Sequence, residues 1–564
     1  MGTRVISDGS LPQWTKDLKP SIRAKVYEIP ARGSINLGAS ITFDGLHIKA
    51  EMDVIFDSAR IFVCEFFRAP GWSQSQGLSE IFFELVILFW DEKTRLLFLN
   101  SSIGNELYFD RIAQCVVTNC ELSPVPLYRL QRVFGNTTNA QFVNVGMRNG
   151  TVGNSSEAYR MLSGPNAHLA VTRTDSRTHI RGHAFAKGTF DQGITSLGFT
   201  DSGKIWSMNK SSGISEIIQQ FRLLAQRIKS IVSFTTNSEL DSLSAGDIIT
   251  AIPQDVVAAS WHERFYANYD FKLHDIPLLE WDIIIDRQGK TTTELPFILK
   301  HGEISYRIVY QVSSPHFLAA SSDHMVILSR NTELIPLLNS YPLKFYTATQ
   351  SLIMGSQIFH LQQTLPPLDH KKLHTPIWLN VDITTEVGAG KSGQVSIHDF
   401  VCTELQRSSP GIVFYDHQTG EIADFITIDQ HSRQIEVALY HVKASSEDFA
   451  GSRVEDLYEI CGQAVKSVQW LKPQFIFERL LWREAQDPQR LVQTTLGTLD
   501  TFVKGYKANP VPVVFRLILV QPGISKRKLT KRNKQTDKLL EILAATEDYV
   551  RRVSDASLQI WTSA

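Results

Sequence analysis

Cysteine is scarce in this chain, which has five cysteines in 564 residues. Their odd number and scattered positions argue against a disulfide framework and favour a reducing compartment. Cys115 and Cys120 have no second pair of metal ligands near them in the sequence, which argues against a zinc site. We therefore expect a protein of the cytoplasm without structural disulfides.

Long apolar runs are also missing. The most hydrophobic stretch, residues 81–90, is interrupted by Glu84 and is far shorter than the roughly 20 residues that a membrane-spanning helix needs. The first 20 residues contain no apolar segment of the kind found in signal peptides. The sequence therefore predicts a soluble protein without a membrane partner.

Neither sign of charge is in excess, because the chain has 57 Lys and Arg residues and 58 Asp and Glu residues. A neutral molecule has no overall field that attracts nucleic acid, so nucleic-acid binding would need a local basic patch. The best candidate is a predicted basic loop near the C-terminus, formed by Lys526, Arg527, Lys528, Lys531, Arg532 and Lys534.

The length exceeds what one hydrophobic core supports, so several domains are expected. Residues 1–236 read as a β-rich domain ending in an amphipathic helix, and residues 237–375 as a second β-rich domain. In residues 376–564 the hydrophobic pattern predicts a helix at 395–405 and strands at 411–415, 423–428 and 435–443. It also predicts a helix at 453–471, which ends before Pro473. A buried strand at 511–520 and a helix at 537–553 follow, which makes this an α/β domain.

Chemistry-bearing residues gather on the predicted hairpin of the last domain, in Gly420-Glu-Ile-Ala-Asp and Leu439-Tyr-His-Val-Lys-Ala. This arrangement resembles the PD-(D/E)xK nucleases, which place an Asp on one strand and (D/E)-x-K near the end of the next. The resemblance implies a restriction-endonuclease-like fold and a phosphodiester hydrolase that uses Mg²⁺ or Mn²⁺. It makes Asp424 a metal ligand and Lys443 the residue that positions or deprotonates the attacking water.

One position departs from that pattern, because His441 stands where the second acid is expected. Strand alternation places Glu436 on the opposite face, so it cannot replace the acid without a bulge. Imidazole suits transition metals better than Mg²⁺, which leaves Mn²⁺ or an added acid open. The resemblance therefore implies a metal ion bound by Asp424 and His441, with Glu421 or Glu404 as the added acid.

The resemblance assigns further residues on the helix that follows Lys443. Gln463 stands where some relatives carry a Gln that completes the catalytic site. Arg453 and Lys466 are candidate phosphate contacts.

The same segments, with Asp456-Leu-Tyr-Glu-Ile-Cys-Gly-Gln-Ala, are similar to the C-terminal region of bacterial phage-defence helicase–nuclease proteins. Helicase motor motifs are lacking here, so this resemblance implies a separate helicase or sensor protein as partner. It implies an antiviral effector whose substrate is nucleic acid, with DNA favoured over RNA. Many nucleases of this type dimerise, which leaves a homo-oligomer open. The alternative is a catalytically inactive scaffold that binds nucleic acid or a partner protein.

Two other segments invite a functional reading. Gly388-Ala-Gly-Lys-Ser resembles the end of a phosphate-binding P-loop, but Thr385 stands where its first glycine is required.

Between residues 135 and 207 the only clear strand is predicted at 194–199. A cluster there predicts a charged surface loop, or alternatively a nucleic-acid or partner contact: Arg173, Arg177, His179, Arg181, His183 and Lys187.

Overall fold

The computed structural model divides into two compact units. The N-terminal unit comprises residues 1–171 and 175–363, and the C-terminal unit comprises residues 172–174 and 364–564. The structure describes residues 4–5, 19–29, 49–56, 58–68, 80–102, 109, 112, 122–134, 140–151, 157–230, 240, 242–267, 271–313, 315–320, 326–327, 332–361, 368–408, 410–531 and 533–564. Cys115, Cys120 and Arg532 lie outside these ranges. In the described ranges no helix is both long and apolar enough to cross a membrane.

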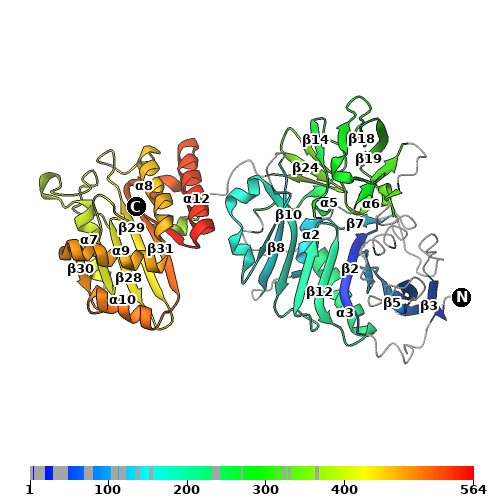
Figure 1. The fold of residues 1–564 in the computed structure, drawn as a ribbon, viewed down its shortest axis with the longest axis horizontal. Coiled ribbons are helices and arrows are strands. Elements are labelled where there is room, and N and C mark those ends of the chain that lie inside the picture. Colours follow the sequence, from blue (N-terminus) through cyan, green and yellow to red (C-terminus); the bar gives the residue numbers. More distant parts are fainter. Residues whose placement is uncertain are drawn as a thin grey trace. The chain divides into compact units, whose positions relative to one another are not determined.

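The N-terminal unit begins with a mainly antiparallel sheet whose main strand order is β1-β3-β4-β5-β6-β2-β12-β11-β10-β8-β9 (Figure 1). Helix α3 (Ile214–Lys229) covers it, and the Phe221 ring packs on Phe89 and Phe98. The strands are β1 (Arg4–Val5), β2 (Ser21–Glu28), β3 (Lys49–Phe56), β4 (Ala59–Arg68), β5 (Glu80–Asp91), β6 (Leu96–Ser101), β8 (Gln141–Asn149), β9 (Tyr159–Ser163), β10 (His179–Lys187), β11 (Ser196–Thr200) and β12 (Lys204–Lys210).

The prediction of a charged surface loop for the Arg- and His-rich cluster is wrong, because strand β10 contains most of it. His179 and Arg181 are buried. The Arg181 guanidinium donates to the Gln131 side chain and to the carbonyl of Leu240, which satisfies its charge inside the protein. A buried polar side chain with partners is compatible with a strand, so charge alone was a poor sign of a loop.

The remainder of this unit consists of three smaller sheets around a second core. The predicted boundary near residue 236 falls inside the unit, since Leu352 and Phe359 pack in the same core as the large sheet. The longest elements are β14 (Val256–Ser260), β17 (Asp282–Ile285), β18 (Glu294–His301), β19 (Ile304–Gln311), α6 (Leu334–Ser340), β23 (Lys344–Thr347), β24 (Ser351–Met354) and β25 (Gln357–His360).

Lys344 at the start of β23 is a buried cation. Only 2% of its surface is exposed, and its ammonium group has no hydrogen bond or ion pair with any residue that the structure describes. Burial, with a contribution from the nearby Arg148 charge, lowers the pKa of its ammonium group to about 8. Lys344 therefore destabilises the folded unit at neutral pH.

Lys344→Met is expected to stabilise the N-terminal unit at pH 7. A tenfold change in proton affinity is worth about 1.4 kcal/mol, so a pKa of about 8 in place of the unfolded value of about 10.4 corresponds to about 3 kcal/mol. Between these values the unfolded chain binds more protons than the folded one, so wild-type stability rises with pH. The advantage of the variant should therefore disappear near pH 10.5.

Thermal unfolding of both proteins at pH 7 and pH 10.5 measures this difference. The exposed Lys272 provides a matched control, because Lys272→Met should leave the unfolding temperature unchanged at both values. A Lys344→Met protein that is no more stable than wild type at pH 7 would show that the lysine is not destabilising.

The C-terminal unit contains one mixed sheet of order β26-β32-β31-β29-β28-β27-β30 (Figure 1). Strands β29, β31 and β32 are parallel, whereas β28 is antiparallel to β27 and β29. The elements are β26 (Leu373–His374), α7 (Ile397–Ser408), β27 (Ile412–Tyr415), β28 (Phe425–Gln430), β29 (Ile435–Val442), α8 (Glu455–Ser467), α9 (Pro473–Gln486), β30 (Leu491–Thr494), α10 (Leu499–Ala508), β31 (Val513–Ser525), α11 (Lys526–Thr530), α12 (Lys534–Ser554) and β32 (Ser557–Ser563).

Strand alternation separates the two faces of this sheet. Val437 and Leu439 of β29 pack in one core with α8, α9 and α12. Ala438 and Val442 pack in a second core with α7. The mixed α/β character and most of the predicted elements are confirmed, but the prediction for Pro473 is incomplete: besides following α8, it starts helix α9, where proline has no amide hydrogen to lose.

Candidate metal centre

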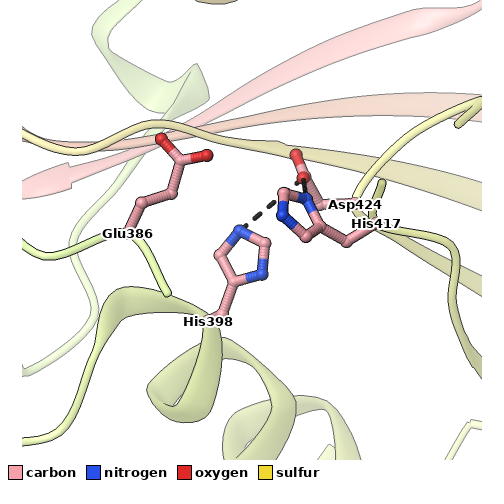
Figure 2. A group of neighbouring side chains, drawn as sticks. All are labelled: Glu386, His398, His417 and Asp424. Atoms are coloured by element: carbon pink, nitrogen blue, oxygen red, sulfur yellow. Dashed lines mark hydrogen bonds and ion pairs between the residues drawn. The ribbon is translucent and has the colours of Figure 1, made fainter. Parts of the chain in front are cut away.

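Four side chains from separate segments meet on the α7 side of this sheet. Glu386, His398, His417 and Asp424 each offer one ligand atom, and these atoms all lie within 4.8 Å of one another. Figure 2 shows the two histidine rings beside the Asp424 carboxylate, with Glu386 reaching in from another segment. Among the sequence-based predictions of metal ligands, Asp424 belongs to this group.

Asp424 directly precedes β28 and is almost fully buried. The amide of Val442, at the end of β29, donates to its Oδ2 at 2.8 Å, and its own amide donates to the Tyr440 carbonyl at 2.9 Å. Burial is the main cause that raises the pKa of this carboxyl to about 6, and the neighbouring Glu421 adds to the effect. A nearby cation would stabilise the charged form of this buried carboxylate, which accepts a hydrogen bond from one backbone amide.

His398 lies in the first turn of α7. Its Nδ1 is 3.2 Å from the hydroxyl of Tyr415. Its buried Nε2 lies 3.6 Å from Asp424 Oδ1 and has no hydrogen-bond partner in the part of the chain that the structure describes. Burial, with smaller effects of His417 and Lys443, lowers the pKa of this imidazole to about 3. The ring is therefore neutral at pH 7. In the tautomer that carries its proton on Nδ1, toward Tyr415, the lone pair of Nε2 points at the other three side chains of the candidate metal site.

His417 occupies the turn between β27 and β28. Its Nδ1 lies 2.8 Å from Asp424 Oδ1 and 3.3 Å from Glu421 Oε2. The predicted ligand Glu421 thus lies beside the group, in contact with one of its members.

A buried ion pair supports that turn. Asp416 is fully buried, and the Arg483 guanidinium of α9 donates to its Oδ1 at 2.5 Å and to its carbonyl at 2.7 Å. Arg490 donates to the carbonyl of His417 at 3.2 Å. These contacts fix the backbone on both sides of His417.

Glu386 lies just before Gly388-Ala-Gly-Lys-Ser, the segment that resembles the end of a P-loop. Its carbonyl accepts from the His398 amide at 3.1 Å, which ties it to the start of α7. Lys443, just past β29, lies 3.3 Å from Glu386 and 3.0 Å from Glu459 of α8. Burial lowers the pKa of Lys443, but the two carboxylates outweigh it and leave a net rise. A protonated Lys443 can donate hydrogen bonds but cannot accept a proton.

Other residues that the resemblance singled out lie elsewhere. His441 faces α8, where its Nε2 lies 2.7 Å from Ser467 Oγ, and burial lowers its pKa to about 3. Glu404 pairs with Arg407 on α7 at 2.6 Å, and Glu436 pairs with Arg516. Gln463 lies one turn beyond Glu459 on α8, and its buried Oε1 has no hydrogen-bond partner among the described residues.

The predicted nucleic-acid contacts fall into two classes. Arg453 is engaged inside the protein, since it pairs with Glu447 and Asp456. The basic segment is largely helical rather than a loop, because it forms α11 and the start of α12. The side chains that it exposes are Arg527, Lys528, Lys531 and Lys534, and Lys466 is exposed on α8, while Lys526 is half-buried and donates to the Leu373 carbonyl.

Two imidazoles and two carboxylates form a plausible ligand set for a divalent transition metal. Mg²⁺ prefers oxygen ligands, whereas imidazole suits Mn²⁺, Zn²⁺ and related ions. The unpartnered Nε2 of His398 fits this role, because a buried acceptor without a partner is rare in proteins. The residues present therefore fit a metal ion of this class.

Glu386, His398 and His417 were not predicted from the sequence. They share no spacing motif with Asp424, and the only available signal was a polar residue in an apolar context, such as His398 in the first turn of α7. No family model, curated protein or solved structure matches this chain.

Proposed function

We propose that the C-terminal unit is a metal-dependent nuclease with a restriction-endonuclease-like fold. The observation that carries this proposal is the convergence of Glu386, His398, His417 and Asp424 within 4.8 Å, next to Lys443. This set replaces His441 and Glu404 as ligands and keeps Asp424 and Lys443 from the resemblance. It favours Mn²⁺ or a similar ion over Mg²⁺.

The residues of the chain have distinct tasks in this proposal. Asp424, His398 and His417 hold the metal on one side, while Glu386 reaches it from the segment before α7. A bound divalent ion would lower the pKa of a water molecule and stabilise charge on a phosphate. Lys443, kept protonated by Glu386 and Glu459, would donate to a phosphate oxygen or to that water. Gln463 stays a predicted contributor through its unpartnered amide oxygen.

The loop that leaves this site carries an exposed aromatic ring. Residues 444–453 follow Lys443, and the Phe449 side chain in this loop is 81% exposed. The Lys528 ammonium donates to the Ala450 carbonyl at 3.0 Å, so α11 contacts the residue that follows Phe449. An exposed aromatic ring near a lysine suits the stacking and phosphate contacts of a nucleic acid. This supports a nucleic acid, with DNA as the predicted substrate.

Cleavage assays test the proposal. Plasmid, linear duplex DNA, single-stranded DNA and RNA are incubated with the full chain in Mn²⁺ or Mg²⁺. We expect metal-dependent cutting that is faster in Mn²⁺. Lys443→Ala should slow it by at least about 100-fold, the effect typical of removing one electrostatic stabiliser.

Lys507→Ala serves as the matched control, because Lys507 is an exposed lysine of α10. This variant should cut at the wild-type rate. The assay is repeated with a candidate helicase or sensor protein added. If no substrate is then cut with either metal, the protein is the inactive scaffold rather than a nuclease. The antiviral role and the helicase or sensor partner stay predictions from the resemblance.

A further inference from the structure

The N-terminal unit contains a cavity of about 440 Å³ that the nuclease proposal does not use. Its wall combines residues of the large sheet with residues 262–267 and 339–357 of the smaller sheets, and this volume lies in the range of pockets that hold small molecules. Pro124, Pro342 and Met354 give the wall apolar surface, and polar side chains lie among them. Apolar surface holds a small ligand, and a few polar groups fix its orientation.

Gln357, at the start of β25, supplies the first of three hydrogen-bond acceptors at this wall. The residue lines the cavity and is only 5% exposed. Its Nε2 donates to the Asp201 carbonyl at 2.8 Å, which identifies the other end of the amide as the oxygen. That oxygen, Oε1, has no hydrogen-bond partner among the described residues. Since buried acceptors are nearly always paired, a ligand that donates an N–H or O–H group would satisfy it.

Glu263, in helix α5 (Glu263–Tyr266), supplies the second acceptor. Its Oε1 pairs with the Arg148 guanidinium, which also holds the Asp201 carboxylate at 2.5 and 3.1 Å. Its buried Oε2 has no hydrogen-bond partner in the part of the chain that the structure describes. Because Arg148 already places a cation beside both acids, a neutral donor is sufficient at Oε2.

His316, just before β20 (Phe317–Ala319), supplies the third acceptor and also lines the cavity. Its Nδ1 lies 3.1 Å from the Gln311 carbonyl, and because a carbonyl only accepts, the proton is on Nδ1. Burial lowers the pKa of this imidazole, so the ring is neutral at pH 7 and Nε2 carries a lone pair. The three acceptors thus come from separate segments, and a ligand that satisfies them carries several hydrogen-bond donors.

We propose that this cavity binds a nucleoside whose base carries an amino group. The amino groups of adenine, cytosine and guanine are uncharged donors, whereas an aliphatic amine is a cation at pH 7 and would compete with Arg148. The amino group donates to Gln357 Oε1, and a further N–H or hydroxyl group donates to Glu263 Oε2. The flat base packs on Pro342 and Met354. The ligand is bound whether or not the C-terminal unit cleaves nucleic acid.

Isothermal titration calorimetry of the full chain tests this assignment, in EDTA so that no metal ion contributes. The probes are adenosine, guanosine and cytidine, each beside the analogue that lacks its amino group: purine riboside, inosine and zebularine. At least one parent nucleoside should bind with a Kd below about 1 mM. Its analogue should bind at least about tenfold more weakly, because it leaves Gln357 Oε1 unpaired. The 5′-monophosphates are titrated as well, and the tighter of the two forms identifies the source of the base.

Gln357→Met removes the acceptor and keeps the length of the side chain. It should weaken the best nucleoside by at least about tenfold and abolish the difference between this nucleoside and its analogue. Gln288→Met is the matched control, because Gln288 is exposed and lies outside the cavity wall, and it should bind as wild type does. If Gln357→Met does not fold, Glu263→Gln takes its place. It exchanges a charged acceptor for a neutral one and should cost at least about threefold.

Four results would overturn the assignment. The first is that none of the nucleosides or their monophosphates binds at about 1 mM. The second is that each analogue binds as tightly as its parent, and the third is that Gln357→Met and Glu263→Gln both bind like wild type. The fourth is that agmatine, a cationic N–H donor without a base, binds more tightly than the best nucleoside, which would make the cavity a site for a cation.

Discussion

His398→Leu is expected to abolish Mn²⁺ binding and to slow cleavage by more than about 100-fold, since loss of an outer-shell partner of a metal ligand already costs 10- to 100-fold. The variant removes the imidazole whose buried Nε2 points at Asp424 and has no hydrogen-bond partner among the described residues. The metal-free protein should not lose stability, because an unpaired buried acceptor costs about 1–3 kcal/mol and leucine removes it. Calorimetry with Mn²⁺, thermal unfolding and a cleavage assay measure the three effects.

His431 provides the matched control for this variant. It is an exposed histidine in the turn between β28 and β29, so His431→Leu should bind Mn²⁺ and cut as wild type does. If His398→Leu bound Mn²⁺ with wild-type affinity, His398 would not be a ligand. The centre would then have to be sought among Glu386, His417, Asp424 and Glu421.

Arg483→Met is expected to destabilise the turn that carries His417. The variant leaves the fully buried Asp416 carboxylate without its 2.5 Å partner, and removal of one partner of a buried ion pair costs about 3–5 kcal/mol. Burial already raises the pKa of Asp416, and loss of the guanidinium should raise it further. Amide hydrogen exchange across β27 and β28 should become at least about 100-fold faster.

Two further variants show whether the ion pair itself is responsible. Lys504→Met removes an exposed pair with Asp500 on α10, and such pairs are worth less than about 1 kcal/mol. The double variant Arg483→Met/Asp416→Asn should recover part of the loss, because it no longer buries a lone charge. Unchanged exchange in Arg483→Met would mean that the ion pair does not hold this turn.

Much of the C-terminal unit could be predicted because its apolar pattern is regular. The buried run of β31 and the stripe of α8 follow directly from hydrophobic periodicity. Helix α9 was missed because Pro473 was interpreted only as the residue that ends the preceding helix. Proline is also common in the first turn of a helix. Strand β10 was missed for another reason: buried partners satisfy Arg181, which composition cannot reveal.

The candidate site was only partly predictable from the sequence. Alternation correctly places His441 and Leu439 on one face of β29, but that face packs against α8. The metal group lies on the α7 side, and its members come from three segments: the residues before α7, α7 itself and the connection between β27 and β28. His417 lies seven residues before Asp424 in that connection, whereas only the tertiary fold brings His398 and Glu386 to it. A search for the second ligand on β29 therefore could not find them.

The most direct measurement is anomalous diffraction at the manganese edge from crystals of the full chain grown with Mn²⁺. The nuclease proposal predicts one strong peak at coordination distance from His398 Nε2 and the Asp424 carboxylate, with His417 and Glu386 around it. The peak should be absent from His398→Leu crystals grown in the same way. A peak at another position, or none at this group, would contradict the proposed metal centre.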